Sequence, residues 1–275
     1  MDILDTTFPL KQHATYPEDV IFKHIEDNID KYDHIDKTIV NFSIFPLMNS
    51  GVSYARIQQI LDMIISKVEN PIFIINYDKS DEYFNFGNSI VFTPEATYGR
   101  DNFFGIPRDP QITDDGTKYD RDILFSFRGA NWTHPIRKKL VDMYPNECLG
   151  YSGWGCDNKD PQFKIDYINQ LKRSIFSLCP RGYGRTSFRL YESMMMGSIP
   201  VIISDAWKPP LYDVLDWNEF SLYVDENDIS RIPEILATLS DEVRIKMGER
   251  AKEVYYEYFS NENMYKCFDL VMGGI

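Results

Sequence analysis

The sequence predicts an α/β fold with mostly parallel sheets, divided between two lobes. Short apolar runs alternate with helical patterns along nearly the whole chain, as they do where helices join parallel strands. The 275 residues are enough for two modest domains. Residues 105–122 are rich in Pro, Gly and Asp and lack periodicity, so we interpret them as the connection between the lobes. We expect an N-terminal lobe at 1–115, a C-terminal lobe at 116–260, and a helix at 261–275 that crosses back to the first lobe.

The expected strands are apolar and short, and the expected helices show an apolar stripe. The predicted strands are residues 38–45, 71–77, 123–129, 175–180 and 199–204. The clearest helix is 53–69, where apolar residues recur at helical spacing: Ile57, Ile60, Leu61, Ile64 and Ile65. Residues 163–174 and 241–259 show the same kind of pattern.

Charge narrows the class of partner. The formal net charge of −13 argues against a nucleic-acid partner, because lysine and arginine drive that binding by displacing counterions from phosphates. An anionic membrane surface is disfavoured for the same reason. Residues 171–191 run against the trend, with five basic residues and no Asp or Glu: Lys172, Arg173, Arg181, Arg185 and Arg189. This local positive charge suits a small anion.

Nothing in the sequence predicts export or a membrane span. The first residues lack the basic and apolar regions of a signal peptide, and no apolar run approaches the ~20 residues that a spanning helix needs. The four cysteines lack the paired spacings of zinc or redox motifs, so we expect reduced, mostly buried thiols. A soluble protein of the cytoplasm is the simplest interpretation.

The loop RGYGRT, residues 181–186, lies between a predicted strand and a predicted helix that begins near Ser187. A glycine loop before a helix presents unpaired backbone N–H groups and the positive end of the helix dipole to an anion. Gly182 and Gly184 allow close approach to the backbone, and Arg181 is the first candidate for a phosphate contact. Tyr183, Thr186 and Ser187 complete the expected binding loop. The loop is not a P-loop, because no GxxxxGK[ST] pattern is present, so ATP hydrolysis is disfavoured.

Arg189 and Glu192 are three residues apart on the predicted helix and therefore share a face. A cation near phosphate followed by a carboxylate resembles a nucleotide clamp, with Glu192 accepting hydrogen bonds from ribose hydroxyls. The alternative is a surface ion pair of small energetic value. The acid-free basic segment around the pair favours the clamp.

The run LCPRGYGRTSFRLYESMMMGSIPVIISDAWKPPLYDVLDWNEFSLYV resembles the signature region of the exostosin family, glycosyltransferase family 47. The shared features are a C-P-x-G loop, S-x-R-x-x-E, G-x-x-P-V, S-D, P-P and D-W-x-x-F. Upstream, ILFSFRGANWTHPIRKKL is similar to that family's strand with a basic residue and glycine, followed by a P-x-R helix start. The chain looks like the short, unanchored members found in large DNA viruses of algae.

The resemblance implies a GT-B fold, with two Rossmann-like lobes whose parallel sheets face a cleft, and here with a reduced N-terminal lobe. It also implies a UDP-sugar donor in the C-terminal lobe, a glycan acceptor in the N-terminal lobe, and inversion without an essential metal or other cofactor. Retaining relatives usually carry a second glutamate eight residues before the ribose-binding one, and that position here is Gly184. The only Asp-x-Asp tripeptide, Asp120 to Asp122, precedes a strand rather than following one, so we interpret it as a solvated loop rather than a metal site.

An inverting transfer needs a base for the acceptor hydroxyl and positive groups for the leaving diphosphate. Arg128 and Arg181 are the expected positive groups, although Arg128 can equally be a structural ion-pair partner. For the base, the candidates are Asp78 and Asp81, with loop carboxylates as the alternative interpretation. His134 begins a predicted helix and is either a cap or a residue of the cleft.

The transferred sugar is not encoded in these residues; the short lobe and plant-like motifs favour xylose. The alternative function is a GT-B-shaped protein that binds a nucleotide or glycan without turnover.

Overall fold

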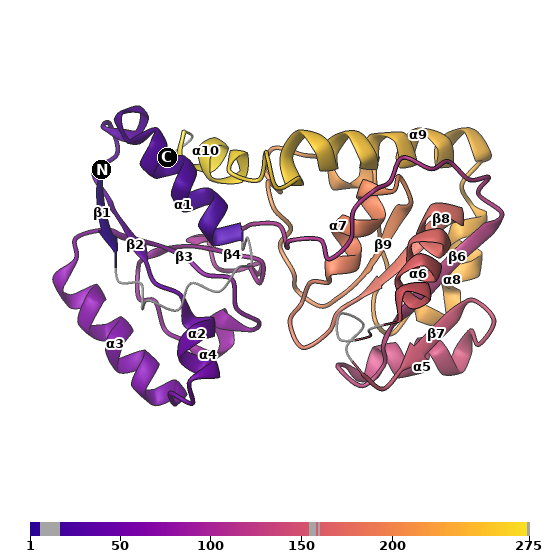
Figure 1. The fold of residues 1–275 in the computed structure, drawn as a ribbon, viewed down its shortest axis with the longest axis horizontal. Helices are drawn as coiled ribbons and strands as arrows, with labels where there is room; N and C mark the ends of the chain where they lie inside the picture. Colours follow the sequence, from indigo (N-terminus) through magenta and orange to yellow (C-terminus); the bar gives the residue numbers. More distant parts are fainter. Residues whose placement is uncertain (6–16, 154–157, 159, 274–275) are drawn as a thin grey trace. The chain divides into compact units, whose positions relative to one another are not determined.

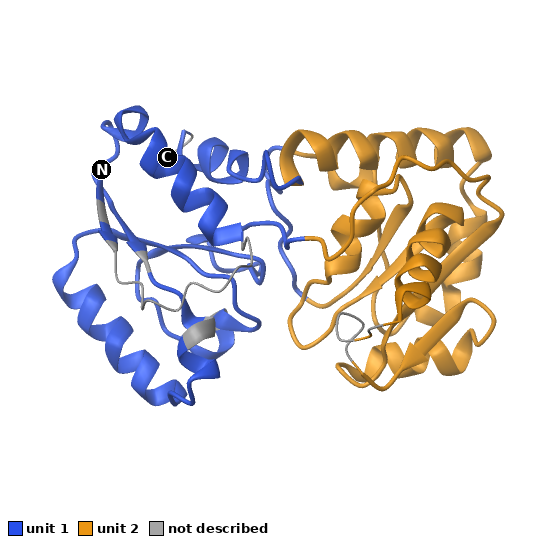
Figure 2. Cartoon of the chain, viewed as in Figure 1, with its two compact units in different colours: residues 1–109, 206–214, 260–275 blue, residues 110–205, 215–259 orange. Residues whose placement is uncertain are grey.

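A computed structural model describes residues 1–5, 17–153, 158 and 160–273 of the chain. The chain divides into two compact units (Figure 2). Unit 1 comprises residues 1–109, 206–214 and 260–275, and unit 2 comprises residues 110–205 and 215–259. Each unit contains one parallel sheet with its own helices (Figure 1), which confirms the expected α/β class.

Unit 1 is built on a sheet whose strands follow one another in chain order, β1-β2-β3-β4-β5, all parallel. The strands are β1 (Asp2–Asp5), β2 (Thr38–Asn41), β3 (Pro71–Ile74), β4 (Ile90–Thr93) and β5 (Phe103–Gly105). The helices are α1 (Pro17–Asp27), α2 (Ile44–Asn49), α3 (Tyr54–Lys67), α4 (Ser80–Tyr83) and α10 (Lys266–Met272).

Helices cover both faces of this sheet, with α1 and α10 on one side and α2, α3 and α4 on the other (Figure 1). The alternation of side chains along β4 explains this, because Val91 belongs to the apolar cluster that also contains Ile57 and Leu61 of α3. On the other face, the Phe92 ring lies 4.9 Å from that of Phe268 in α10.

Unit 2 is built on a sheet in the order β10-β9-β8-β6-β7, again all parallel. Its strands are β6 (Ile123–Ala130), β7 (Cys148–Tyr151), β8 (Ser174–Pro180), β9 (Ile199–Ile203) and β10 (Leu222–Tyr223). Its helices are α5 (Pro135–Met143), α6 (Pro161–Arg173), α7 (Phe188–Met195), α8 (Ile232–Ala237) and α9 (Asp241–Val254).

The order of strands in unit 2 reverses direction next to β6. From β6 the chain passes to β7 on one side and then crosses to β8 on the other side, after which β9 and β10 continue outward. This is a doubly wound sheet with a switch point between β6 and β8. An apolar cluster that includes Phe127, Phe176, Leu140 and Leu236 joins the strands to α5 and α8.

Three expectations differ from the structure. The strand predicted at 38–45 ends at Asn41, and Ile44 begins a helix because Ile44 and Leu47 turn into the cluster under α3. Residues 206–214 group with unit 1 rather than with the C-terminal lobe, since the Trp207 indole donates to the Pro94 carbonyl (2.8 Å). The helix predicted at 241–259 ends at Val254 and continues as a π-helical turn.

The described cysteines, Cys148, Cys179 and Cys267, are buried free thiols, while Cys156 lies outside the described residues.

Candidate functional site

The carboxyl edge of the unit 2 sheet carries most of the residues that the sequence singled out. Strand β6 ends at Ala130 and its neighbour β8 ends at Pro180. Ligands of open parallel sheets bind outside the strand ends where the strand order reverses, and here that place lies between these two strands. The loops that follow β6 and β8 therefore form the candidate site.

Arg137 holds the two strand ends together. Its guanidinium donates to the carbonyls of Ala130 (3.2 Å), Pro180 (3.0 Å) and Arg181 (2.8 Å), so one side chain from α5 spans both strands. Burial and then the nearby charge of Arg189 lower the pKa of Arg137 to about 10. The P-x-R pattern does not by itself predict this role for Arg137, because it does not show which groups the arginine reaches.

Arg189 is a buried cation with no ion-pair partner within 4 Å among the described residues. Only 7% of it is exposed, and its guanidinium lies over the rings of Phe127 and Tyr167, 4.8 Å from each centroid. A Cβ on Gly129, at the end of β6, would lie 3.1 Å from Arg189 Nη2, so the guanidinium reaches the strand end. Hydrogen-bond and ion-pair partners for Arg189 are absent from the described part of the chain. A buried charge is costly unless it is paired, so the arrangement favours an anionic ligand.

Tyr167 links Glu192 to Arg189, and no ion pair joins the two directly among the described residues. The Tyr167 hydroxyl donates to Glu192 Oε2, while Oε1 accepts from the backbone N–H of Gln111 (2.9 Å). Arg189, the Tyr167 ring and Glu192 thus form a chain of contacts, with Glu192 only 3% exposed. Both clamp residues lie on one helix as expected, and each contacts Tyr167.

Arg181 lies at the start of the loop after β8 and pairs with Asp205, which follows β9. Arg181 is 6% exposed, whereas 59% of the Asp205 side chain is exposed. Glu226, after β10, has a buried Oε1 with no partner in the described chain, and burial raises the pKa of Glu226 while the charge of Arg181 opposes the rise. The end of β9 and the loop after β10 thus each bring a carboxylate toward Arg181.

The loop itself is closely packed at its glycine and open at its tyrosine. A Cβ on Gly182 would lie 3.2 Å from Arg137 Nη2, which explains why a glycine suits this position. Tyr183 is 45% exposed, and its ring meets the exposed ring of Trp132 edge-on at 5.6 Å. Thr186 Oγ1 is buried without a partner among the described atoms, and the Ser187 hydroxyl does not cap α7. Neither hydroxyl is thus used to cap α7.

Arg128 and His134 have structural contacts. Arg128 lies 3.7 Å from Asp166 in an ion pair and over the Phe163 ring at 5.9 Å, so it contacts α6. His134 is the N-cap residue of α5, and its Nδ1 accepts from the Ile136 N–H at 3.4 Å. Both residues therefore make the contacts that were the structural alternatives in the sequence: an ion pair for Arg128 and a helix cap for His134.

Unit 1 holds a second cluster of buried charge at the carboxyl edge of its own sheet. Arg108, after β5, pairs with Asp78, which follows β3, and with Glu95 Oε1 (2.6 Å), which follows β4. Although burial opposes its charge, Asp78 and Glu95 raise the pKa of Arg108. Glu18, in the first turn of α1, lies near enough to Arg108 for the charge of Arg108 to favour its ionised form, and Asn76 hydrogen-bonds to it. The sequence analysis named Asp78 but neither Glu18 nor Arg108.

The remaining residues that the sequence singled out are Asp81 and the Asp-x-Asp tripeptide. Asp81 lies in α4, but its side chain is outside the described part of the structure. Asp122 of the Asp-x-Asp tripeptide pairs with Arg173 (2.7 Å to Nε), and the Arg121 guanidinium donates to the Met196 carbonyl (2.7 Å). Within the described ranges, no group of three or more His, Cys, Asp or Glu side chains is arranged to hold a metal, and no helix has the length and apolarity to cross a membrane.

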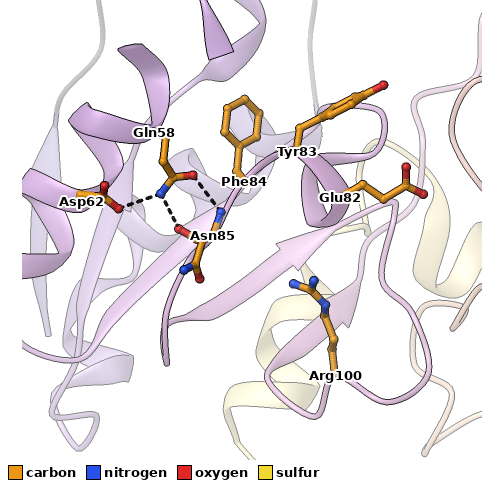
Figure 3. A pocket seen from close by; sticks show the side chains of 7 residues that line it. All are labelled: Gln58, Asp62, Glu82, Tyr83, Phe84, Asn85 and Arg100. Carbon is orange, nitrogen blue, oxygen red and sulfur yellow. Dashed lines mark hydrogen bonds between the residues drawn. The ribbon is translucent and has the colours of Figure 1, made fainter. Parts of the chain in front are cut away.

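A hollow of about 400 Å³ lies elsewhere in unit 1, between α3, α4 and Arg100 (Figure 3). Its Gln58 side chain donates to Asp62 (2.7 Å) and accepts from the backbone N–H of Asn85 (2.8 Å). Glu82 and Arg100 complete the polar wall. None of the described sequence-predicted residues lines it, and the Gln58 amide is already bonded, so we assign it no role.

Solved structures provide only distant likenesses. A glycosyltransferase from Rickettsia africae aligns over 99% of this chain and 97% of that chain, with 9% identity and a TM-score of 0.44. WaaG, a glycosyltransferase involved in lipopolysaccharide biosynthesis, aligns at 11% identity and a TM-score of 0.38. Likenesses of this degree carry no argument about function.

Sequence relatives are closer. The chain is 31% identical over 163 residues to an exostosin-1 homolog of Caenorhabditis elegans, covering 53% of this chain and 43% of that protein. It is 30% identical over 166 residues to a probable glycosyltransferase of Arabidopsis thaliana, covering 56% of this chain and 29% of that protein. A probable glucuronoxylan glucuronosyltransferase of the same plant is 32% identical over 123 residues, covering 42% and 27%. The chain therefore spans less than half the length of these relatives.

The sequence also matches the exostosin GT47 domain over residues 70–239, which is more than half of the chain. This match contains Asp78, Arg108, Arg137, Arg181 and the helix with Arg189. The chain belongs to the exostosin GT47 family.

Proposed function

We propose that the protein is a glycosyltransferase that binds a UDP-sugar at the carboxyl edge of the unit 2 sheet and transfers the sugar to a glycan hydroxyl. Family membership supports the reaction class. The observation that carries the donor site is Arg189, a buried guanidinium with no ion-pair partner within 4 Å in the described chain. Its charge, together with the larger effect of burial, lowers the pKa of the neighbouring Arg137. A diphosphate beside these two cations would offset their mutual repulsion and the cost of burying them.

The rest of the site has a place for each part of such a donor. The loop from Arg181 to Ser187 offers backbone N–H groups and two hydroxyls to phosphate oxygens. The exposed rings of Trp132 and Tyr183 offer an apolar surface to a nucleobase. To bind the ribose, Glu192 must lose its present hydrogen bond from Tyr167 or Gln111 and accept one from a ribose hydroxyl instead.

The finer assignments belong to the same proposal. Inversion fits the glycine at position 184, where retaining relatives usually carry a glutamate. Transfer without an essential metal follows from the resemblance. Xylose remains our preferred sugar, and glucuronic acid is its main competitor because three plant relatives bear the name of glucuronosyltransferases.

In the first experiment, the purified full chain is incubated with each of five donors, with and without a set of glycan acceptors, and UDP release is measured. The donors are UDP-xylose, UDP-glucuronic acid, UDP-galactose, UDP-arabinose and UDP-N-acetylglucosamine. Release of UDP that increases with acceptor, and persists in the presence of a chelator, is expected for one donor. Binding of several donors without consumption of any would instead support a protein that holds sugar nucleotides without turnover.

Replacing Arg189 by Gln tests the donor site. One lost charge-assisted hydrogen bond is worth about 1.5–3 kcal/mol, so the dissociation constant for UDP should rise roughly 10- to 150-fold. The matched control is Arg173→Gln, which removes an exposed cation of the same basic segment that is already paired with Asp122. Isothermal titration that finds equal UDP affinity in both variants would remove Arg189 from the site.

A further inference from the structure

We propose that Glu18 and Asn76 form a site for a sugar hydroxyl in unit 1, where Glu18 Oε2 takes the hydroxyl proton. The inference rests on the proposed function, which supplies the sugar acceptor. Nothing in the sequence resemblance or in the family match, which begins at residue 70, points to Glu18.

The topology of unit 1 brings the two side chains together at one edge of its sheet. Asn76 lies just past the carboxyl end of β3, and Glu18 lies in the first turn of α1, the helix that follows β1. A hydrogen bond links the two side chains. The helix start and the strand end thus meet at the edge where parallel sheets bind their ligands.

Both side chains carry a buried oxygen atom with no donor. Glu18 is 94% buried, and its Oε2 has no hydrogen-bond partner among the described residues. The same is true of Asn76 Oδ1, so the Asn76 amide nitrogen is the donor in its bond to Glu18. Leaving buried polar atoms unsatisfied costs free energy, and below about pH 8 this pair offers one acceptor, Asn76 Oδ1, beside a carboxyl group that still carries its proton, so a ligand group that can both donate and accept fits it. Hydroxyl groups, which both donate and accept, are the groups that a glycan offers.

The other carboxylates of the cluster are less suited to this role. Asp78 and Glu95 share the Arg108 guanidinium, which occupies an oxygen of each. Asp78, one of the two candidate bases that the sequence suggests, is bound to the Arg108 guanidinium, although 43% of its side chain is exposed. Glu18 is the carboxyl of the cluster whose second oxygen has no partner in the described chain.

Burial makes Glu18 a proton acceptor at mildly alkaline pH. A carboxylate in the first turn of a helix is normally exposed and stabilised by the helix dipole. Here burial is the larger effect and, with the neighbouring charge of Asp19, raises the pKa of Glu18 to about 8, against the smaller opposing effects of its own backbone N–H, Asn76 and Arg108. A base of this strength suits abstraction of a proton from a hydroxyl.

The step balances as follows. The acceptor oxygen forms a bond to the anomeric carbon of the donor sugar, and the bond from that carbon to the diphosphate oxygen breaks, its electron pair leaving on UDP. The hydroxyl proton moves to Glu18 Oε2 and is later released to solvent.

The decisive variant is Glu18→Gln, which has the shape of the protonated side chain and is therefore expected to fold. The full chain with this change should bind UDP as the wild type does but transfer sugar 10²- to 10⁴-fold more slowly. Glu26→Gln is the matched control, because it makes the same substitution at an exposed position of the same helix. Asn76→Ala should raise the acceptor KM and leave UDP affinity unchanged.

The pH dependence provides a readout that does not need activity. In the folded chain Glu18 holds its proton up to about pH 8, whereas the unfolded chain loses it near pH 4.5. The wild type should therefore lose stability relative to Glu18→Gln as pH rises from about 5 to 8, and the ascending limb of transfer rate near pH 8 should disappear in the variant.

The possible outcomes separate the role of Glu18 from the proposed glycosyltransferase function. Slow transfer by Glu18→Gln with normal UDP binding, together with the pH-dependent loss of stability, supports the proposal. Wild-type transfer rates in Glu18→Gln overturn it while the glycosyltransferase assignment stands, and so does a stability difference that is independent of pH. A wild type that transfers no sugar from any donor overturns the proposed function, and this inference with it.

Discussion

At the scale of single residues, the arginines of unit 2 differ in what they do although they look alike in the sequence. Arg173 holds an exposed carboxylate, Arg137 holds three carbonyls, and Arg189 lies between two aromatic rings. The sequence predicted the basic character of this segment and the position of Arg189 on the helix. It could not predict Arg137, because the carbonyls that this residue reaches are 7 to 44 positions away along the chain.

The role of Arg137 leads to a prediction about stability. Replacing it by Met keeps most of the apolar stem but leaves the carbonyls of Ala130, Pro180 and Arg181 without this donor, at a cost of about 3 kcal/mol. Urea denaturation should show this loss, whereas Lys138→Met, which removes only an exposed i,i+4 pair with Asp142, should change stability by less than about 0.5 kcal/mol. Equal midpoints for the two variants would mean that Arg137 does not tie the strand ends.

At the scale of elements, the sequence located most of the strands that carry the sites. Residues 123–129, 175–180 and 199–204 were predicted as strands, and β6, β8 and β9 occupy nearly the same positions. Periodicity and burial identify such elements because each buries a continuous apolar run. The same signals could not show that Trp207 and its neighbours pack on unit 1, since that depends on a hydrogen bond to Pro94, far away in the chain.

Segment 206–214 meets strand β5 closely, and this can be tested at Gly105. A Cβ at this glycine would lie 2.6 Å from the backbone nitrogen of Pro210, closer than real contacts allow, so backbone must move. Gly105→Ala should therefore destabilise the protein by about 2 kcal/mol in thermal or chemical denaturation. Gly153→Ala is the control, because an added Cβ there meets nothing within 4 Å. A stable Gly105→Ala variant would show that the segment is not held against β5.

At the scale of the whole molecule, each unit is assembled from separate stretches of chain. Unit 1 receives its last helix, α10, only after all of unit 2, and Phe268 of α10 is fully buried against Phe92 and Tyr32. Asp269 adds polar contacts to Tyr32 and Lys31. The prediction of a C-terminal helix that returns to the first lobe concerned this same stretch.

Deleting residues 260–275 should therefore weaken unit 1 selectively. We expect amide hydrogen exchange to become faster in α1 and β4, because α1 loses the contact of His24 with Asp269 and β4 loses that of Phe92 with Phe268, while exchange in β8 and β9 keeps its wild-type rate. Mass spectrometry of the exchanged peptides measures both in one sample. Faster exchange spread evenly over the two units would indicate that they unfold together.

Because unit 1 contains stretches of chain from both before and after unit 2, the two units are completed in a fixed order during synthesis on the ribosome. Residues up to 259 complete unit 2, whereas the piece that closes the apolar face of unit 1 emerges afterwards. The half of the protein that is begun first is thus finished last, and until then the face around Phe92 stays uncovered by α10. A nascent chain of this protein should consequently be most prone to capture by chaperones just before α10 leaves the exit tunnel.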